Sequence, residues 1–314
     1  MSSDPRVAAL DAFTPTTHSR PSPTLLSAVH NDTPNATASL STVLILGASR
    51  GIGAATAHVF ARAGATHLIL ASTASSTPAL ASVAAAIRRS NAACRVDVRE
   101  CDVADAANVE AMAAYVECVI DAGGRLDAVV LNAGYSGDVE LRVTGGGTAD
   151  VGQWERAFAV NAVGTYLVAR FFVPLLLREE RGRKALLVVG SIAAGIRRGV
   201  IANTKYCVSK MAQVRVVEHV AEQFGAQGLL AVAVHPGAVE TAMAVETAPE
   251  AFMKYLVDDP ELCGHFLVWL TRVPGQFQWL NGRLVSATWD PDELLAKKDE
   301  IVAKDLLKFE VRTE

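Results

Sequence analysis

The chain has 314 residues, of which 51% are apolar and 20% are charged, with a formal net charge of −4. This composition supports a large core and excludes global disorder. The acidic balance argues against a nucleic-acid partner, for which a basic face is expected. The most apolar stretch, 159–177, is interrupted by Asn161, Arg170 and Pro174, so we expect no membrane-spanning helix.

The chain starts with a segment that does not look like a domain. Its first residues, Met-Ser-Ser-Asp-Pro-Arg, lack the basic and apolar regions of a signal peptide. The five cysteines contain no C-x-x-C pair, which favours reduced thiols and a cytoplasmic location. Residues 1–41 are rich in Ser, Thr and Pro without a steady period, and we expect an extension that is flexible or lies over the domain surface.

A strand, a glycine-rich turn and a helix are predicted from residue 43. The apolar run 43–46 leads into Gly47-Ala-Ser-Arg-Gly-Ile-Gly53 and then into a helix that reaches Ala63. Glycines allow the backbone to approach a pyrophosphate, and a helix N-terminus offers free N–H groups and a partial positive charge. The spacing is G-x-x-x-G-x-G, and alone it would equally suit a tight strand-to-helix connection.

Strands and helices then alternate along the chain. Apolar strand-like runs occupy 67–71, 95–100, 128–131, 185–189 and 229–234, and helical patterns occupy 78–90, 106–122, 151–178 and 208–224. We therefore predict an α/β fold: a single domain built on a doubly wound parallel sheet. Ligands of such sheets bind beyond the carboxyl ends of the strands. The candidates at those ends are Gly47, Asp102, Asn132, Ser191 and His235-Pro-Gly237.

Tyr206 and Lys210 fall one turn apart on one helix face. An ammonium group favours a neighbouring phenolate, so we expect the pKa of Tyr206 to fall from about 10 towards the operating pH. The Ser191 hydroxyl would hold the oxygen that exchanges the proton. Because Y-x-x-x-K also occurs by chance in many helices, this pair acquires meaning only from the rest of the chain.

In order along the chain, these motifs resemble those of the short-chain dehydrogenase/reductase family, over about residues 42–241. The glycine turn resembles the cofactor motif, Asp102 the aspartate that meets adenine, and Asn132-Ala-Gly134 the N-A-G turn. Asn161 resembles the asparagine that holds a relay water, and Pro236-Gly237 through Thr241 the segment at the nicotinamide.

The resemblance implies a Rossmann fold, no metal, and two sets of site residues. The catalytic set is Asn161, Ser191, Tyr206 and Lys210. The cofactor set is Gly47, Ser49, Arg50, Gly51, Ile52, Gly53, Ser72, Asp102, Val103, Asn132, Ala133, Gly134, Tyr206, Lys210, Pro236, Gly237, Val239 and Thr241.

The two ends of the chain depart from the common family pattern. The usual closing strand with an aspartate and two glycines is absent, and 281–290 leads into a predicted amphipathic helix over 291–308. These ends are similar to those of a fungal branch often found in secondary metabolism. We expect an extension at 1–41, a catalytic domain at 42–290 with a lid at about 242–266, and a C-terminal extension at 291–314.

The residues around the glycine turn favour NADP over NAD as cofactor. Arg50 could meet the 2′-phosphate, and the segment Ala71-Ser72-Thr73 lacks the acid that usually binds the ribose hydroxyls in NAD enzymes. The apolar residues of the lid suggest a largely apolar substrate.

The expected function is NADP(H)-dependent interconversion of a ketone or aldehyde and an alcohol on a small molecule, by a homodimer or homotetramer. A non-redox dehydratase, isomerase or cyclase on the same scaffold stays open, as does a nucleotide-sensing binding protein, because fold alone does not decide function.

Overall fold

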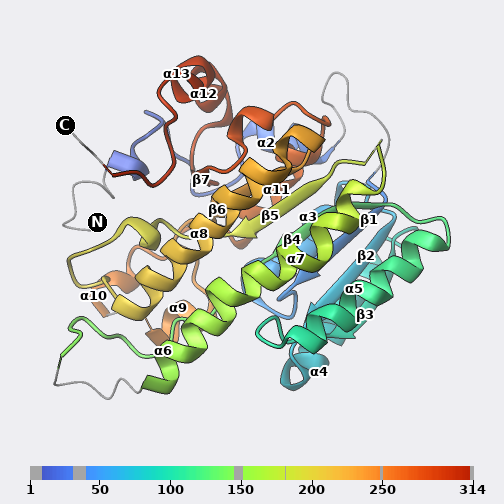
Figure 1. Cartoon of the computed structure of the whole chain (residues 1–314), viewed down its shortest axis with the longest axis horizontal. Coiled ribbons are helices and arrows are strands. Elements are labelled where there is room, and N and C mark those ends of the chain that lie inside the picture. The colour runs from blue at the N-terminus through green and yellow to red at the C-terminus, as the bar shows by residue number, and fades with distance from the viewer. Residues whose placement is uncertain (1–8, 31–39, 145–150, 181, 248–249, 312–314) are drawn as a thin grey trace.

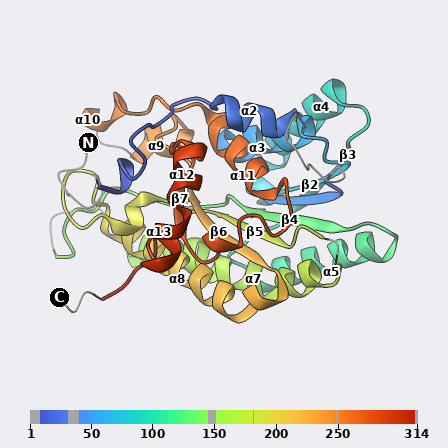
Figure 2. The same ribbon diagram turned by 90° about the horizontal axis from the view of Figure 1, so that it is seen from above.

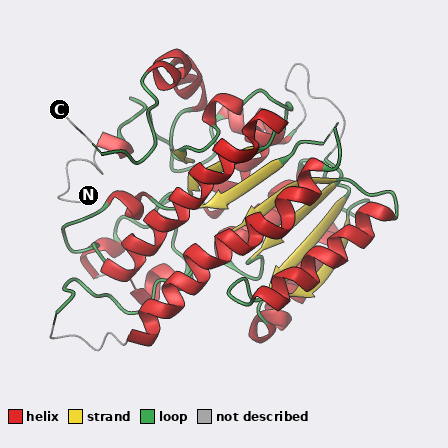
Figure 3. Ribbon diagram, in the orientation of Figure 1, coloured by secondary structure: helices red, strands yellow, loops and turns green. Residues whose placement is uncertain are grey.

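The computed structural model describes residues 9–30, 40–144, 151–180, 182–247 and 250–311. Within them, seven parallel strands form one sheet in the order β3-β2-β1-β4-β5-β6-β7 (Figures 1 and 3). The strands are β1 (Thr42–Leu46), β2 (His67–Ser72), β3 (Arg95–Glu100), β4 (Leu126–Leu131), β5 (Ala185–Val189), β6 (Leu230–His235) and β7 (Leu284–Ser286). The order reverses direction between β1 and β4, so a ligand crevice is expected beyond the carboxyl ends of these two strands.

The central strands are buried on both faces, as their unbroken apolar runs predict. Every residue of β1 and β4 is buried. Because side chains alternate along a strand, Val43 and Ile45 enter one core while Leu44 and Leu46 enter the other. The sheet therefore separates two hydrophobic layers.

Helices cover both faces of the sheet (Figure 2). One layer contains α2 (Pro23–Val29), α3 (Gly51–Arg62), α4 (Thr77–Ser90) and α11 (Pro260–Thr271). The other contains α5 (Ala106–Asp121), α6 (Val151–Phe158), α7 (Gly164–Leu177) and α8 (Thr204–Phe224). The parallel α/β architecture predicted from the sequence is confirmed.

The long helix predicted over 151–178 is interrupted. A π-helical turn, η2 (Ala159–Val163), joins α6 to α7 and contains the buried Asn161. In the described part of the chain this combined helix, Val151–Leu177, is the one segment long and apolar enough to cross a membrane, and 61% of its most apolar window is buried. Packing against the sheet accounts for its apolar character.

Two predictions for the C-terminal region are wrong. Leu284–Ser286 does form a closing strand, parallel to β6, which is too short to show a clear alternation in the sequence. The helix expected over 291–308 is instead two short helices, α12 (Pro291–Ala296) and α13 (Lys298–Ala303). Asp305 and Leu307 have φ angles of 46° and 69°, in the left-handed region, so the helix cannot continue through them.

The described N-terminal residues 9–30 are part of the core. Leu25, Ala28 and Val29 of α2 are buried in the same cluster as α3 and α11. The indole of Trp289 packs on Phe13, with ring centroids 4.9 Å apart, and donates to the backbone oxygen of Leu10 at 3.0 Å. The boundary drawn at residue 41 therefore divides segments that share one core.

The remaining described helices are short. They are α9 (Ala242–Thr247) and α10 (Glu250–Met253), with the 3₁₀ turns η1 (Ala74–Ser76), η3 (Ile192–Gly195), η4 (Gly225–Gln227) and η5 (Gln278–Leu280). α9 begins immediately after Thr241, six residues beyond the end of β6 at His235.

Candidate active site

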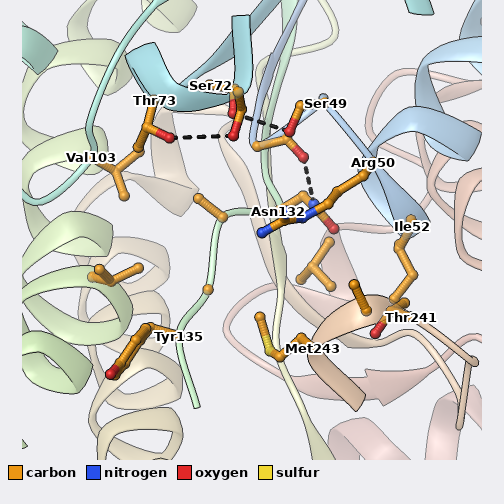
Figure 4. A pocket seen from close by; sticks show the side chains of 18 of the residues that line it. Ser49, Arg50, Ile52, Ser72, Thr73, Val103, Asn132, Tyr135, Thr241 and Met243 are labelled. Atoms are coloured by element: carbon orange, nitrogen blue, oxygen red, sulfur yellow. Dashed lines mark hydrogen bonds between the residues drawn. The ribbon is translucent and has the colours of Figure 1, made fainter. Parts of the chain in front are cut away.

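A cavity of about 340 Å³ lies beyond the carboxyl ends of the strands. Figure 4 shows Ser49, Ser72 and Thr73 on one side of it and Thr241 and Met243 on the other. The predicted cofactor residues that line it are Gly47, Ser49, Arg50, Gly51, Ile52, Ser72, Asp102, Val103, Asn132, Ala133, Gly134, Tyr206, Lys210, Pro236 and Thr241. These residues come from the carboxyl ends of five strands, β1, β2, β3, β4 and β6, and from α8.

Five of the predicted residues do not line the cavity: Gly53, Asn161, Ser191, Gly237 and Val239. Among the other lining residues, Ala242 and Met243 belong to the predicted lid, and Thr73 to the segment noted for its missing acid. The sequence analysis did not name as site residues Ser76, Cys101, Tyr135, Arg156, Val160, Val189 and Gly190. Most of these are chain neighbours of predicted residues. Arg156 is not, and no motif in the sequence marks it.

The glycine turn is packed tightly against the turn after β4. Gly47 has a φ of 90°, and a Cβ on it would lie 2.6 Å from the backbone nitrogen of Ala133. A Cβ on Gly53 would lie 2.1 Å from the Gly47 oxygen, which also accepts a hydrogen bond from Asn132 Nδ2 at 2.8 Å. Larger residues at these two positions would push the turns apart.

The start of α3 fits the pyrophosphate of a dinucleotide. Arg50 is the N-cap residue but its side chain does not cap the helix, and the first turn carries no acid. The first N–H groups of a helix lack partners within it and favour an anion. This helix start opens on the cavity, because Gly51 and Ile52 line it.

The far side of the cavity from Tyr206 is rich in hydroxyl groups. Ser72 donates to Ser49 Oγ at 3.1 Å, and Thr73 and Ser76 share a hydrogen bond at 3.5 Å. Asp102 is the one acid among the described lining residues, and its carboxylate pairs with Arg156 at 3.0 Å. Because Arg50 and Arg156 both line the cavity, its lining carries more positive than negative charge.

The Tyr206 phenol is hydrogen-bonded to Ser191. Ser191 is itself fixed, because its hydroxyl accepts from the backbone of Ala193 at 3.1 Å and caps η3. Burial raises the pKa of Tyr206 to about 12, while the Ser191 hydrogen bond acts in the opposite direction. At neutral pH the phenol is protonated and is a proton donor.

The expectation that Lys210 lowers the pKa of Tyr206 is wrong for this structure. The Lys210 amino group lies 5.8 Å from the centroid of the Tyr206 ring, and burial and the Ser191 hydrogen bond, not Lys210, shift the pKa of the phenol. It donates instead to the backbone oxygen of Val189 at 3.0 Å and to Gln213 Oε1 at 2.8 Å. Burial lowers the pKa of Lys210 to about 7.

The Asn161 side chain fixes the turn that follows β4. Its Oδ1 accepts from the Tyr135 nitrogen at 3.0 Å, and its Nδ2 donates to the Tyr135 oxygen at 2.8 Å and to Ser209 Oγ at 2.9 Å. Asn161 thereby ties α8 to the cavity wall. The water-holding role that the resemblance implies for it stays a prediction.

The predicted lid at 242–266 is too long. Ala242 and Met243 of α9 line the cavity, but α11 begins at Pro260 and packs on α3. A Cβ on Gly264 would lie 3.0 Å from Thr56 Cα, and Phe266 is fully buried in the core. The cover over the cavity therefore ends before α11.

Comparison with known proteins agrees with this geometry. A family model described as short chain dehydrogenase matches residues 41–251, two thirds of the chain. The chain belongs to the short-chain dehydrogenase/reductase family. It is an oxidoreductase of that family, related to short-chain dehydrogenases from fungi.

Three fungal relatives match this short-chain dehydrogenase almost end to end. The short chain dehydrogenases mpl6 of Monascus purpureus and citE of Monascus ruber are each 40% identical to it over 295 residues, covering 92% of this chain and 96% of theirs. The short chain dehydrogenase pgmD of Aspergillus terreus is 33% identical over 301 residues, covering 95% of this chain and 93% of its own. The similarity therefore extends beyond the family core into the flanking segments.

Two solved structures share the fold. A 7α-hydroxysteroid dehydrogenase complexed with NADH and 7-oxo glycochenodeoxycholic acid is 22% identical, with a TM-score of 0.67, and the match covers 79% of this chain and 92% of that one. The Pseudomonas aeruginosa RhlG/NADP complex is 21% identical, with a TM-score of 0.66 and coverage of 78% and 94%. Proteins of this fold thus bind either nicotinamide cofactor.

Proposed function

We propose that this short-chain dehydrogenase uses NADP(H) to interconvert a ketone or aldehyde and the corresponding alcohol on a largely apolar small molecule. One observation carries the proposal: Tyr206 and Lys210 line the same cavity as the open start of α3. A single cavity therefore offers a protonated phenol to a substrate oxygen and an anion site to a dinucleotide.

Different residues of the cavity would bind the cofactor and transfer the proton. When bound, the dinucleotide supplies the hydride for reduction or accepts it in oxidation. The N–H groups at the start of α3 would hold its pyrophosphate. Tyr206 would donate its proton to the carbonyl oxygen in reduction and take it back in oxidation, with Ser191 hydrogen-bonded to the phenol.

The preference for NADP rests on the hydroxyl-rich side of the cavity. Ser72 and Thr73 lie at the end of β2, where an acid would repel a 2′-phosphate, and Arg50 lines the same cavity. The neighbouring acid Glu100 does not line the cavity, and it accepts a hydrogen bond from Thr77 Oγ1 at 3.0 Å. These contacts support a phosphate-bearing ribose.

The proposed substrate is apolar because of the side chains that line the cavity together with Tyr206. Val160, Val189 and Met243 line the cavity together with the ring of Tyr135. The relatives from Monascus and Aspergillus support an intermediate of fungal secondary metabolism as the substrate class.

The test combines a ketone panel with Tyr206→Phe. Purified enzyme is mixed with NADPH and bulky apolar ketones, and both nicotinamide absorbance and product are followed. Because positioned proton transfer contributes about 10²–10⁴-fold, we expect kcat to fall by that factor, with the Kd for NADPH changing only a few-fold. Tyr166→Phe, a matched change at an exposed tyrosine of α7, should leave kcat unchanged.

Product formation without cofactor oxidation would contradict the proposal and indicate a non-redox reaction. Tight NADPH binding without turnover of any ketone or alcohol would indicate a nucleotide-sensing protein instead.

A further inference from the structure

The buried side chain of Gln213 accepts a hydrogen bond from the Lys210 ammonium group. Lys210 and Gln213 are one turn apart in α8, with the Lys210 amino group 2.8 Å from Gln213 Oε1. Gln213 is fully buried and Lys210 is 3% exposed, so water does not compete freely for this contact. A buried amide at this place has a specific partner.

The other half of the amide is also occupied. Gln213 Nε2 donates to Thr165 Oγ1 at 3.0 Å, and Thr165 Oγ1 donates to the backbone oxygen of Asn161 at 2.7 Å. An ammonium can only donate, so the amide must turn its oxygen to Lys210 and its nitrogen to Thr165. The hydrogen bonds therefore run in one direction, from Lys210 through Gln213 and Thr165. The last of them ends on the backbone oxygen of Asn161, in the π-helical turn η2.

Both groups that accept hydrogen bonds from the Lys210 ammonium are uncharged. The Lys210 amino group donates hydrogen bonds to the Val189 backbone oxygen and to Gln213 Oε1. Burial lowers the pKa of Lys210 to about 7. The titratable groups that face it are Tyr206 on the same helix and His235 at the end of β6. Burial, and then the charge of Lys210, lower the pKa of His235 to about 4, and burial raises that of Tyr206 to about 12. Lys210 is thus the group of this set that titrates near neutral pH.

We propose that Gln213 is a positioning residue that holds Lys210 at the cavity wall as an ammonium, braced by Thr165 and the turn at Asn161. The mechanistic consequence rests on the proposed function, in which Lys210 and Tyr206 act at one site. Burial, and not Lys210, sets the resting pKa of the phenol, but both residues line one cavity. There the ammonium would favour the negative charge that develops when the phenol releases its proton. Gln213 acts through Lys210 and touches neither substrate nor the reacting atoms.

The first test uses two nearly isosteric changes with opposite expectations. Gln213→Leu removes the acceptor and makes the ammonium less favourable, whereas Gln213→Glu places a carboxylate beside it. Loss of a hydrogen bond to a charged group lowers the pKa of Lys210 by on the order of one unit, and the carboxylate raises it. Carbonyl reduction requires the charged form of Lys210, so kcat should fall on the alkaline side of its pH profile. That alkaline limb should move to lower pH in Gln213→Leu and to higher pH in Gln213→Glu.

Gln223→Leu is the matched control, since Gln223 is an exposed glutamine of the same helix. It should leave the limb unchanged. A purely structural role for Gln213 would lower the melting temperature and kcat at every pH without moving the limb. Coincident limbs in wild type and both Gln213 variants would overturn the proposal.

A second measurement does not depend on turnover. Lysine ¹³Cε signals of the full chain are titrated by NMR, and the Lys210 signal is assigned by its loss in Lys210→Met. The midpoint should be lower in Gln213→Leu and higher in Gln213→Glu than in wild type. Unchanged midpoints would sink the role of Gln213. Shifted midpoints in a protein that oxidises no nicotinamide would support that role and defeat only the proposed function.

Discussion

Two arginines, Arg50 and Arg156, line the cavity with different electrostatic roles. Asp102 neutralises Arg156, whereas no acid in the described part of the chain makes an ion pair with Arg50. A guanidinium without an acidic partner can donate charged hydrogen bonds to a phosphate. A guanidinium that is already paired can instead stack on an aromatic ring of the cofactor or support the cavity wall. The two residues should therefore affect the two nicotinamide cofactors differently.

We predict that Arg50→Ala weakens NADPH binding by about 10–100-fold, since a hydrogen bond to a charged group contributes about 1.5–3 kcal/mol. NADH, which lacks the 2′-phosphate, should lose little. Arg156→Ala should weaken both cofactors by a similar factor. Fluorescence titrations at low and moderate salt give all four changes in Kd, and equal losses of NADPH and NADH in Arg50→Ala would rule out the phosphate contact.

At the residue scale, sequence motifs located the chemistry but not its electrostatics. The spacing of Tyr206 and Lys210 predicted their common site, because i and i+4 share a helix face. The direction of the Tyr206 pKa shift depends on burial and on where the lysine points, which spacing does not contain. Arg156 was missed because its partner Asp102 is distant in sequence. Gln213 was missed because its contact with Lys210 depends on where the lysine points, and its contact with Thr165 is distant in sequence.

At the element scale, the segment before α11 holds the turn that follows β6. The Ala238 nitrogen donates to Asp258 Oδ2 at 2.6 Å, and the Asp258 nitrogen donates back to the Ala238 oxygen at 3.1 Å. Gly237 has a φ of 94°, and a Cβ there would lie 2.7 Å from the Asp258 carboxylate. The position of Pro236 at the cavity therefore depends on Asp258.

The N-terminal segment adds a second carboxyl group beside this turn. Burial raises the pKa of Asp258, against the hydrogen bond from Ala238, and burial with repulsion from Asp258 raises the pKa of Asp11. Raised pKa values mean that the folded chain prefers both groups protonated. Their contribution to stability is full below the ordinary aspartate pKa of about 4 and is lost as pH rises through the folded values.

We predict that Asp11→Asn has a higher melting temperature than wild type at pH 7 and that the difference disappears as pH falls below about 4. Neutralising Asp11 removes both its own burial cost and its repulsion of Asp258. Calorimetry over this pH range measures the difference, with exposed Asp299→Asn as a control that should show none. A difference that is independent of pH would show that the two carboxyl groups are not coupled.

The elements themselves were largely predictable from hydrophobic pattern, and the exceptions have physical causes. β1, β2, β4, β5 and β6 carry the apolar runs that a sheet buried on both faces requires, whereas the edge strand β3 alternates polar residues with Val96 and Val98. β7 has three residues, too few for a period, and depends on the exposed edge of β6 for its existence. The π-helical turn at Asn161 arises from tertiary contacts with Tyr135 and Ser209, which no local pattern encodes.

At the scale of the whole molecule, the two chain ends close one side of the domain together (Figure 2). His18 bonds Asp290 at 2.8 Å, Thr16 Oγ1 bonds Glu293 at 2.7 Å, and the Arg272 guanidinium donates to the Val29 oxygen at 3.0 Å. These partners are more than 240 residues apart in sequence. The burial of the N-terminal segment depends on residues at the other end of the chain. Its own Ser, Thr and Pro-rich composition does not show those contacts, and it therefore suggested a loose extension.

If α2 is part of the core, its buried and exposed leucines must differ in their effect on stability. Leu25 is fully buried and Leu26 is 41% exposed, on the same helix and next to each other in sequence. We predict that Leu25→Ala lowers the free energy of unfolding by about 2–5 kcal/mol, because it leaves a cavity against α11. Leu26→Ala should change it by less than about 0.5 kcal/mol, since the helix propensity lost is the same and no core contact is removed. Urea unfolding of the full-length variants measures both, and equal small losses would show that residues 9–30 can detach without opening the core.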